Sequence, residues 1–218
     1  MEIKSDSLLS AWKNALQAIY QQGNEFNDQD GRVCRELLNL VITIDDPEKT
    51  VMRPIEWLRA QESWIYPSLD QIAKIVFSKH RSLLYTYEYG DRAFHFNGKK
   101  NQIRDFITPL LLQNPESRRA LVCFYDPLTD SDLSNSAAPS LILAQFRVVS
   151  RKLHVTGYLR SNDLFIGWPA NVYQLFLLQK WVAEKLQTPT GTLTTLSGSA
   201  HLFMEYEEEM KRLLNDVV

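Results

Sequence analysis

The spacing of apolar residues alternates along the chain between a helical and a strand period. Helices are predicted over 7–22, 69–79, 101–113, 168–186 and 205–214, and the period of 3.6 is clearest in the first, third and fourth of these. Asp6 or Ser7 can cap the first helix, and Gly23 can end it. Strands are predicted over 37–44, 120–125, 141–149, 153–159 and a threonine-rich run that ends at His201.

Three stretches follow neither period. Residues 47–68 mix prolines with tryptophans, 85–96 is rich in aromatic residues but broken by Gly90, and 128–138 is polar. We expect all three to be irregular, with the rings of 85–96 packed near a cavity. The chain has no repeat, low-complexity segment or linker, so the pattern predicts one α+β domain over residues 1–218.

Composition limits the partners. The 218 residues are 44% apolar and 23% charged with a net charge of −2, so nothing global favours nucleic acid. The two cysteines, Cys34 and Cys123, are too few for a disulfide framework, and we expect both to be buried, inert thiols. The spacing of the histidines does not suggest a metal site. No secretory signal and no apolar run of about 20 residues is present, so a cytoplasmic protein without a membrane partner is the default expectation.

Polar chemistry gathers where the paired strands 141–149 and 153–159 end. Arg160, Ser161 and Asp163 come directly after them, and Gly167 and Asn171 follow. A guanidinium beside a hydroxyl suits a phosphate, and the side-chain amide of Asn171 suits a base edge such as that of uracil. The alternative for Asn171 is that it caps or braces the following helix.

A second pair of cations, Arg118 and Arg119, precedes the predicted strand 120–125. Two adjacent guanidiniums can bind phosphate oxygens from different sides. The residues alone slightly favour the alternative, in which both arginines are solvated or paired with Glu116 and Asp126. His201 is a lone histidine, which is more often structural than catalytic. Nothing in the spacing shows that these groups converge.

Two long motifs resemble one known family. Residues 114–119, NPESRR, look like the NP(D/E)SRR signature of the thymidylate synthase and deoxycytidylate hydroxymethylase family. Residues 160–171, RSNDLFIGWPAN, are similar to its RSxDxxLGxPxN segment. Other family residues occur in the expected order along the chain, namely Tyr89-Gly90, Pro139, Gln145-Phe146 and His201. Residues 12–47 also resemble the amino-terminal region of short archaeal-type members.

The resemblance implies a large mixed sheet packed with helices, and a homodimer formed sheet to sheet. Arg118 and Arg119 would reach the nucleotide phosphate of the partner, and Arg160 and Ser161 would hold the phosphate in their own subunit. The remaining implied contacts are Asn171 to the pyrimidine, His201 to the sugar, Gln145 to the substrate, and Asp163 and Gly167 to the cofactor, 5,10-methylenetetrahydrofolate.

The chain departs from the family pattern at the chemical centre. Ser140 stands where the family has its nucleophilic cysteine, and Leu141 replaces the histidine that follows. Phe203 replaces a tyrosine that contacts the sugar, and the first phosphate arginine is replaced by Gln29, with Arg32 close by. A serine hydroxyl is a far weaker nucleophile than a thiolate unless a base activates it.

Three interpretations follow. The chain is a C5 methyl- or hydroxymethyltransferase that manages with Ser140, a nucleotide-binding protein without cysteine-dependent C5 methylation, or a binder of nucleotide-like metabolites for another reaction. The joint loss of thiolate and base favours the second interpretation over the first.

Overall fold

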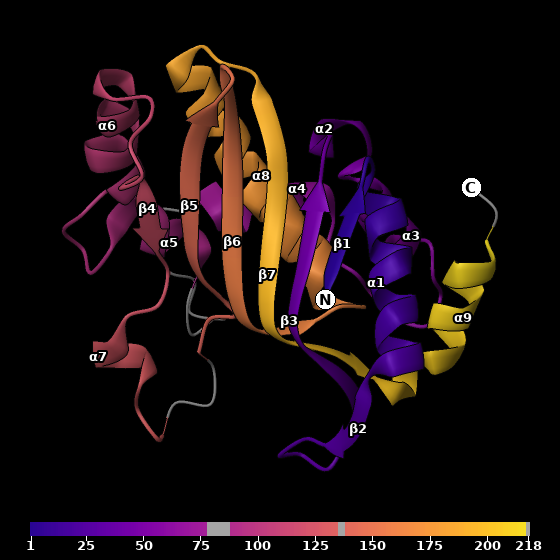
Figure 1. Cartoon of the computed structure of the whole chain (residues 1–218). Helices are drawn as coiled ribbons and strands as arrows, with labels where there is room; N and C mark the ends of the chain where they lie inside the picture. Colours follow the sequence, from indigo (N-terminus) through magenta and orange to yellow (C-terminus); the bar gives the residue numbers. More distant parts are fainter. Residues whose placement is uncertain (78–87, 135–137, 217–218) are drawn as a thin grey trace.

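A seven-stranded mixed sheet organises the described residues, which are 1–77, 88–134 and 138–216 of this computed structural model. The strand order is β1-β3-β7-β6-β5-β4, and β2 pairs with β3 beside this path (Figure 1). The strands are β1 Glu2–Ser5, β2 Asn24–Asn27, β3 Val33–Ile44, β4 Leu121–Cys123, β5 Leu141–Val149, β6 Lys152–Asp163 and β7 Thr190–Phe203. Only β1 with β3 and β6 with β7 are parallel.

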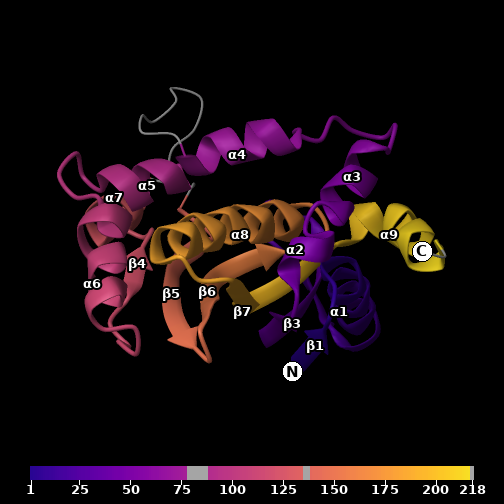
Figure 2. The same cartoon turned by 90° about the horizontal axis from the view of Figure 1, so that it is seen from above.

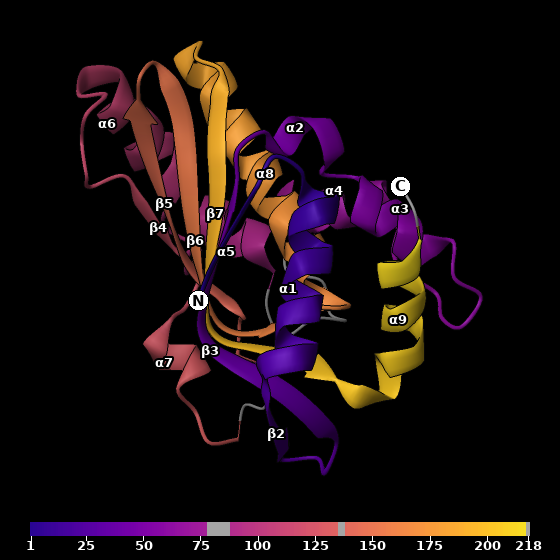
Figure 3. The same ribbon diagram turned by 45° about the vertical axis from the view of Figure 1, so that its right-hand side comes forward.

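The helices cover one face of this sheet. They are α1 Leu8–Gln22, α2 Pro47–Thr50, α3 Arg53–Arg59, α4 Leu69–Phe77, α5 Tyr89–His95, α6 Thr108–Gln113, α7 Pro127–Asp130, α8 Gly167–Leu186 and α9 Glu207–Asn215. Helix α8 runs along the sheet beneath α4 and α5, while the opposite face carries no helix of the described segments (Figure 2). Helix α1 packs against β3, and α9 stands beside α1 on the side away from the sheet (Figure 3). The predicted mixed sheet packed with helices is confirmed.

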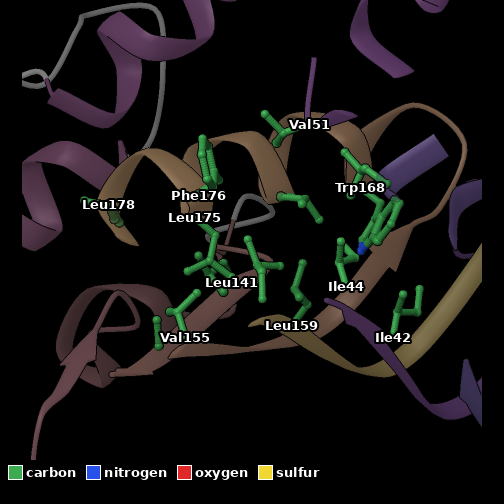
Figure 4. Packing of buried hydrophobic residues seen from close by; sticks show 14 of the residues in the cluster. Ile42, Ile44, Val51, Leu141, Val155, Leu159, Trp168, Leu175, Phe176 and Leu178 are labelled. Atoms are coloured by element: carbon green, nitrogen blue, oxygen red, sulfur yellow. The ribbon is translucent and has the colours of Figure 1, made fainter. Parts of the chain in front are cut away.

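The core lies between α8 and the sheet. Side chains of α8 meet side chains from β3, β5 and β6 across this layer (Figure 4). The labelled contacts are made by Trp168, Leu175, Phe176 and Leu178 above and by Ile42, Ile44, Leu141, Val155 and Leu159 below. No helix of the residues that the structure describes is long and apolar enough to cross a membrane.

The strongly periodic segments fold as predicted. Helix α1 starts after Ser7, whose Oγ accepts a hydrogen bond from the backbone N–H of Ser10 at 3.2 Å, and it ends at Gly23. The predicted helix over 101–113 is a π-helical turn, Ile103–Ile107, followed by α6. The predicted carboxyl-terminal helix begins with a 3-10 turn at Met204–Tyr206 and continues as α9.

The irregular segments were predicted less well, and proline is the main reason. Residues 47–59 form α2 and α3, and α7 occupies the start of the polar stretch 128–138. Pro47, Pro54 and Pro127 lie in the first turns of these helices, where a missing N–H costs nothing. These three prolines are therefore helix starts, and the longer described runs that remain irregular in the two stretches are 60–68 and 131–134.

The aromatic stretch 85–96 was also predicted as a loop. Its first residues lie outside the described part of the chain, but Tyr89–His95 forms α5. Buried contacts fix this helix: the Tyr89 hydroxyl accepts from the Leu141 N–H at 3.1 Å, and Arg92 pairs with Asp130 at 2.8 Å. The Tyr89 ring packs edge-on against Phe124, 5.4 Å between centroids. These partners are distant in sequence, so the local pattern could not reveal the helix.

Candidate functional site

A cavity of about 490 Å³ opens along β3, β7 and β6, beside the turn that joins β2 to β3. Its lining contains three residues of the predicted site, Arg160, Ser161 and His201. The other lining residues are Phe26, Asn27, Asp28, Gln29, Asp30, Arg32, Cys34, Glu36, Ser199 and Phe203. The structure therefore brings the end of β6 together with the end of β7, which spacing could not establish.

A shift in the alternation of β6 places both Arg160 and Ser161 in this cavity. Buried positions alternate up to Leu159, but the next buried residue is Asn162 instead of Ser161. In β7 the buried positions run to Ser197 and resume at Ala200. Because successive side chains of a regular strand point to opposite faces, Arg160 and Ser161 share one side only through this shift.

The Arg160 guanidinium is fixed by the segment that leads to Ser140. Its Nε donates to the carbonyl oxygen of Pro139 at 3.1 Å, and its Nη2 donates to that of Ala138 at 2.8 Å. A guanidinium has five N–H groups. Three of them remain for an anion, and the Arg160 side chain is held in place before an anion arrives.

Ser140 is half-buried directly before β5, and its carbonyl oxygen accepts from the Arg160 N–H at 2.9 Å. Its hydroxyl has no hydrogen-bond partner among the residues described. Leu141, which the resemblance predicts to replace the family histidine, is buried under α8 and has no group that can accept a proton. Ser140 thus lies next to Arg160, and no base among the described residues contacts its hydroxyl.

Arg118 and Arg119 lie elsewhere in the same chain. Both are exposed between α6 and β4, and Arg118 lines a separate hollow with Glu116, Arg147 and residues 148–150. This hollow is at the end of β5, whereas Ser140 precedes its start, about 26 Å away along eight residues of strand. Neither arginine forms an ion pair within the described residues, so the alternative of solvated arginines fits this chain and the alternative of pairing with Glu116 or Asp126 does not.

Gln145 belongs to this second region. Its Nε2 donates to the carbonyl oxygen of Arg118 at 2.7 Å, which ties the arginine segment to β5. Cys123 is exposed and not buried as expected, because Val122 takes the inward position of the short edge strand β4. Cys34 is buried as expected and lines the cavity, and burial raises the pKa of its thiol.

The turn that carries Asp163 is held by two aromatic side chains. Trp12 Nε1 donates to the carbonyl oxygen of Leu164 at 2.6 Å, and the Tyr66 hydroxyl donates to that of Ile166 at 2.7 Å. Asp163 Oδ1 accepts from the backbone N–H groups of Phe165 and Ile166 at 2.9 and 3.1 Å. Burial raises the pKa of Asp163 to about 6, although these amides oppose the shift.

Gly167 and Asn171 lie outside the cavity lining. Gly167 starts α8, and a Cβ there would lie 3.5 Å from the Cβ of Asp163, an ordinary contact. Asn171 is half-buried in the next turn of α8, and its amide has no hydrogen bond with any described residue. Asn171 does not brace the helix through its side chain, and its role in reading a base stays a prediction.

The cavity also contains Arg32 and Phe203, which the sequence analysis named as departures from the family pattern, and Glu36, which it did not select. Arg32 pairs with Asp28 at 2.9 Å, and its guanidinium lies 3.8 Å from the ring centroid of Phe203. Glu36 accepts a hydrogen bond from the Ser199 hydroxyl and lies opposite His201 in the β3–β7 register. A charged residue directly before the apolar run 37–44 was the available signal for Glu36.

Comparisons with known proteins identify the family of this chain. The family model described as Thymidylate synthase matches residues 51–217. A "Putative thymidylate synthase" of Methanosarcina barkeri is 32% identical over 92% of this chain and 88% of its own length. The protein of the same name from Methanococcoides burtonii is 28% identical over 99% and 95%. Thymidylate synthase 1 of Bacillus spizizenii is 29% identical over 75% and 60%. The chain belongs to the thymidylate synthase family.

Proposed function

We propose that this chain binds a pyrimidine nucleoside monophosphate that is dUMP-like in its base and phosphate, and that it does not carry out cysteine-dependent C5 methylation. The observation that carries the proposal is the fixed Arg160 guanidinium, which offers three N–H groups beside Ser161, while no base among the described residues contacts the adjacent Ser140. Arg160 and Ser161 suit an anion, whereas Ser140 has no group in the described part of the chain that would start the reaction.

The phosphate would bind at the end of β6. Arg160 can donate two parallel hydrogen bonds and the Ser161 hydroxyl a third, without the entropy cost of ordering the arginine. His201, which lines the same cavity, would contact the sugar. Burial lowers the pKa of His201, so its ring is neutral at pH 7 and does not repel a cationic neighbour such as Arg32.

The missing reaction step is covalent addition to the pyrimidine. In that step a thiolate adds to C6, and the electron pair of the C5–C6 bond makes C5 a nucleophile towards the one-carbon unit. The hydroxyl of Ser140 would have to lose its proton first, and no titratable side chain of the described residues contacts it. Cys34 does not replace the family cysteine, because it lies on β3 with its thiol against the carbonyl oxygen of Arg32 at 3.4 Å.

Methylenetetrahydrofolate, which supplies a one-carbon unit when bound, fits one feature of the site. Asp163 uses Oδ1 for two backbone amides, while Oδ2 has no hydrogen-bond partner among the described residues. That oxygen can accept a hydrogen bond from a ring N–H of the folate. Asp163, with Gly167 beside it, would therefore hold the cofactor in any member that still binds it.

We assign Arg118 and Arg119 to the site of a second subunit. The uncovered sheet face would form the homodimer interface, and its side chains alternate with the buried ones along β5, β6 and β7. Mixing the double variant R118A/R119A with R160A tests this arrangement. One site of each mixed dimer would then be intact, so about a quarter of all sites should regain binding. No recovery after exchange of subunits would contradict the assignment.

Isothermal titration calorimetry with dUMP, dCMP, UMP and CMP tests the binding proposal. We expect uracil nucleotides to bind more tightly than cytosine nucleotides, because family members that act on cytosine commonly carry an aspartate at the position of Asn171. Equal affinity for dUMP and dCMP would contradict that role of Asn171. No heat with any of the four would refute nucleotide binding.

The alternative is an active C5 methyl- or hydroxymethyltransferase with Ser140 as nucleophile, which the otherwise retained motifs favour. Release of tritium from 5-tritiated dUMP with methylenetetrahydrofolate measures it. We expect no release from the wild-type chain and a slow release from Ser140→Cys, with Ser134→Cys as a control at an exposed serine. Clear release by the wild-type chain would favour the alternative.

A further inference from the structure

Glu36 brings a carboxylate into the part of the cavity assigned to the sugar. It lies on β3 opposite His201 of β7, and both side chains line the cavity. Its Oε1 accepts from the Ser199 hydroxyl, while Oε2 has no hydrogen-bond partner or ion pair among the described residues. One oxygen is therefore anchored and the other remains an acceptor without a donor.

The strand register sets the distance from the phosphate group to this acceptor. Ser161 is in register with Ser199, and Glu36 lies one strand further and two residues along. Two strand spacings and two residues of rise separate the backbones of Ser161 and Glu36 by about 12 Å. A serine hydroxyl, a phosphate, a pentose and a glutamate side chain together fill such a span. The sugar hydroxyls of a nucleotide held at Arg160 and Ser161 would thus meet Glu36 and His201.

The two residues differ in what they offer a sugar. The imidazole of His201 can exchange one hydrogen bond with a hydroxyl, whereas a carboxylate such as that of Glu36 only accepts. A carboxylate that faces a pentose is the usual device for recognising the ribose 2′-hydroxyl in dinucleotide sites. A 2′-deoxy sugar would leave Glu36 without a donor and place its charge against C–H groups.

We propose that Glu36 accepts a hydrogen bond from the 2′-hydroxyl, so that this site prefers pyrimidine ribonucleoside monophosphates to their 2′-deoxy forms. The inference rests on the proposed nucleotide binding and adds the class of sugar to it. The hydrogen bond that links β3 to β7 does not by itself explain why a glutamate stands at position 36. That bond uses one oxygen of Glu36, and an uncharged side chain could accept it from Ser199 equally well.

Calorimetry with UMP, dUMP and 2′-O-methyl-UMP tests the inference on the unaltered chain. We expect UMP to bind roughly tenfold or more tightly than the other two, since a hydrogen bond to a charged group is lost in both cases. Because this comparison uses no variant, it stands even if a substitution at position 36 prevents folding.

Variants then assign the preference to one side chain. In Glu36→Gln, which keeps an acceptor for Ser199, we expect the ratio of UMP to dUMP affinity to fall towards one, and Glu36→Ala should abolish it. Glu25→Gln, at an exposed glutamate on β2, is the matched control and should keep the ratio. Equal binding of UMP and dUMP, or a ratio that survives Glu36→Ala, would overturn this inference alone. No binding of any nucleotide would overturn the proposed function and the inference together.

Discussion

Removal of the Arg160 side chain should weaken nucleotide binding through the phosphate alone. Arg160 uses two of its five N–H groups on the carbonyl oxygens of Ala138 and Pro139 and offers three to a ligand. If two of these contact the phosphate, Arg160→Ala should cost about 3 kcal/mol of binding free energy, or roughly a hundredfold in affinity. Arg160→Lys should recover only part of this loss, because an ammonium cannot keep the two backbone contacts and also grip the phosphate in parallel.

A comparison of nucleotide with nucleoside isolates this contribution. Calorimetry on the wild type and Arg160→Ala would use dUMP and deoxyuridine, which differ only in the phosphate. The loss for dUMP should exceed the loss for deoxyuridine by most of the 3 kcal/mol estimated above. Arg53→Ala, at an exposed arginine of α3, is the control for net charge and should change neither affinity.

An equal loss of affinity for dUMP and for deoxyuridine in Arg160→Ala would refute a contact between Arg160 and the phosphate. That result would mean that the residue acts by shaping the segment before Ser140 and not by contacting the phosphate. The variant also loses two hydrogen bonds to backbone carbonyls, so a fall of about 2 kcal/mol in unfolding free energy is expected. Urea unfolding of each variant separates this effect from binding.

Three further predictions concern the frame of the site. Trp12→Phe leaves the buried carbonyl of Leu164 unpaired and should cost about 2–3 kcal/mol in urea unfolding, whereas Trp57→Phe, whose lost partner is exposed, should cost under about 1 kcal/mol; equal losses would contradict the role of Trp12. Gly191→Ala puts a Cβ 2.7 Å from the His154 ring and should cost about 1–3 kcal/mol, and His154→Ala should relieve it; a double variant as unstable as Gly191→Ala would refute the clash. Because burial raises the pKa of Asp163 to about 6 from 3.8, the unfolded chain loses this proton first, so the carboxyl contributes stability that is lost as pH rises from about 4 to 6. Asp163→Asn should therefore gain up to about 3 kcal/mol over the wild type between those pH values, and a difference that does not vary with pH would refute the shift.

The sequence determined the elements whose apolar period is long and regular. Helices α1 and α8 and strands β5 and β6 begin within a residue or two of their predicted starts, because one face of each is buried and the period records that face. It also supplied the two family motifs, since these are contiguous runs of letters. Three residues that line the cavity, Arg160, Ser161 and His201, belong to those motifs or follow them in the expected order.

Tertiary structure decided which of these residues meet. A regular strand would have separated Arg160 from Ser161, and only the shift in alternation puts both in one cavity. Arg118 and Arg119, equally clear as a motif, lie at the opposite end of β5. Glu36 reached the site through its pairing with β7, a contact 165 residues away in sequence. Local patterns record burial and backbone preference, whereas convergence depends on strand order and register, which are set by contacts between distant segments.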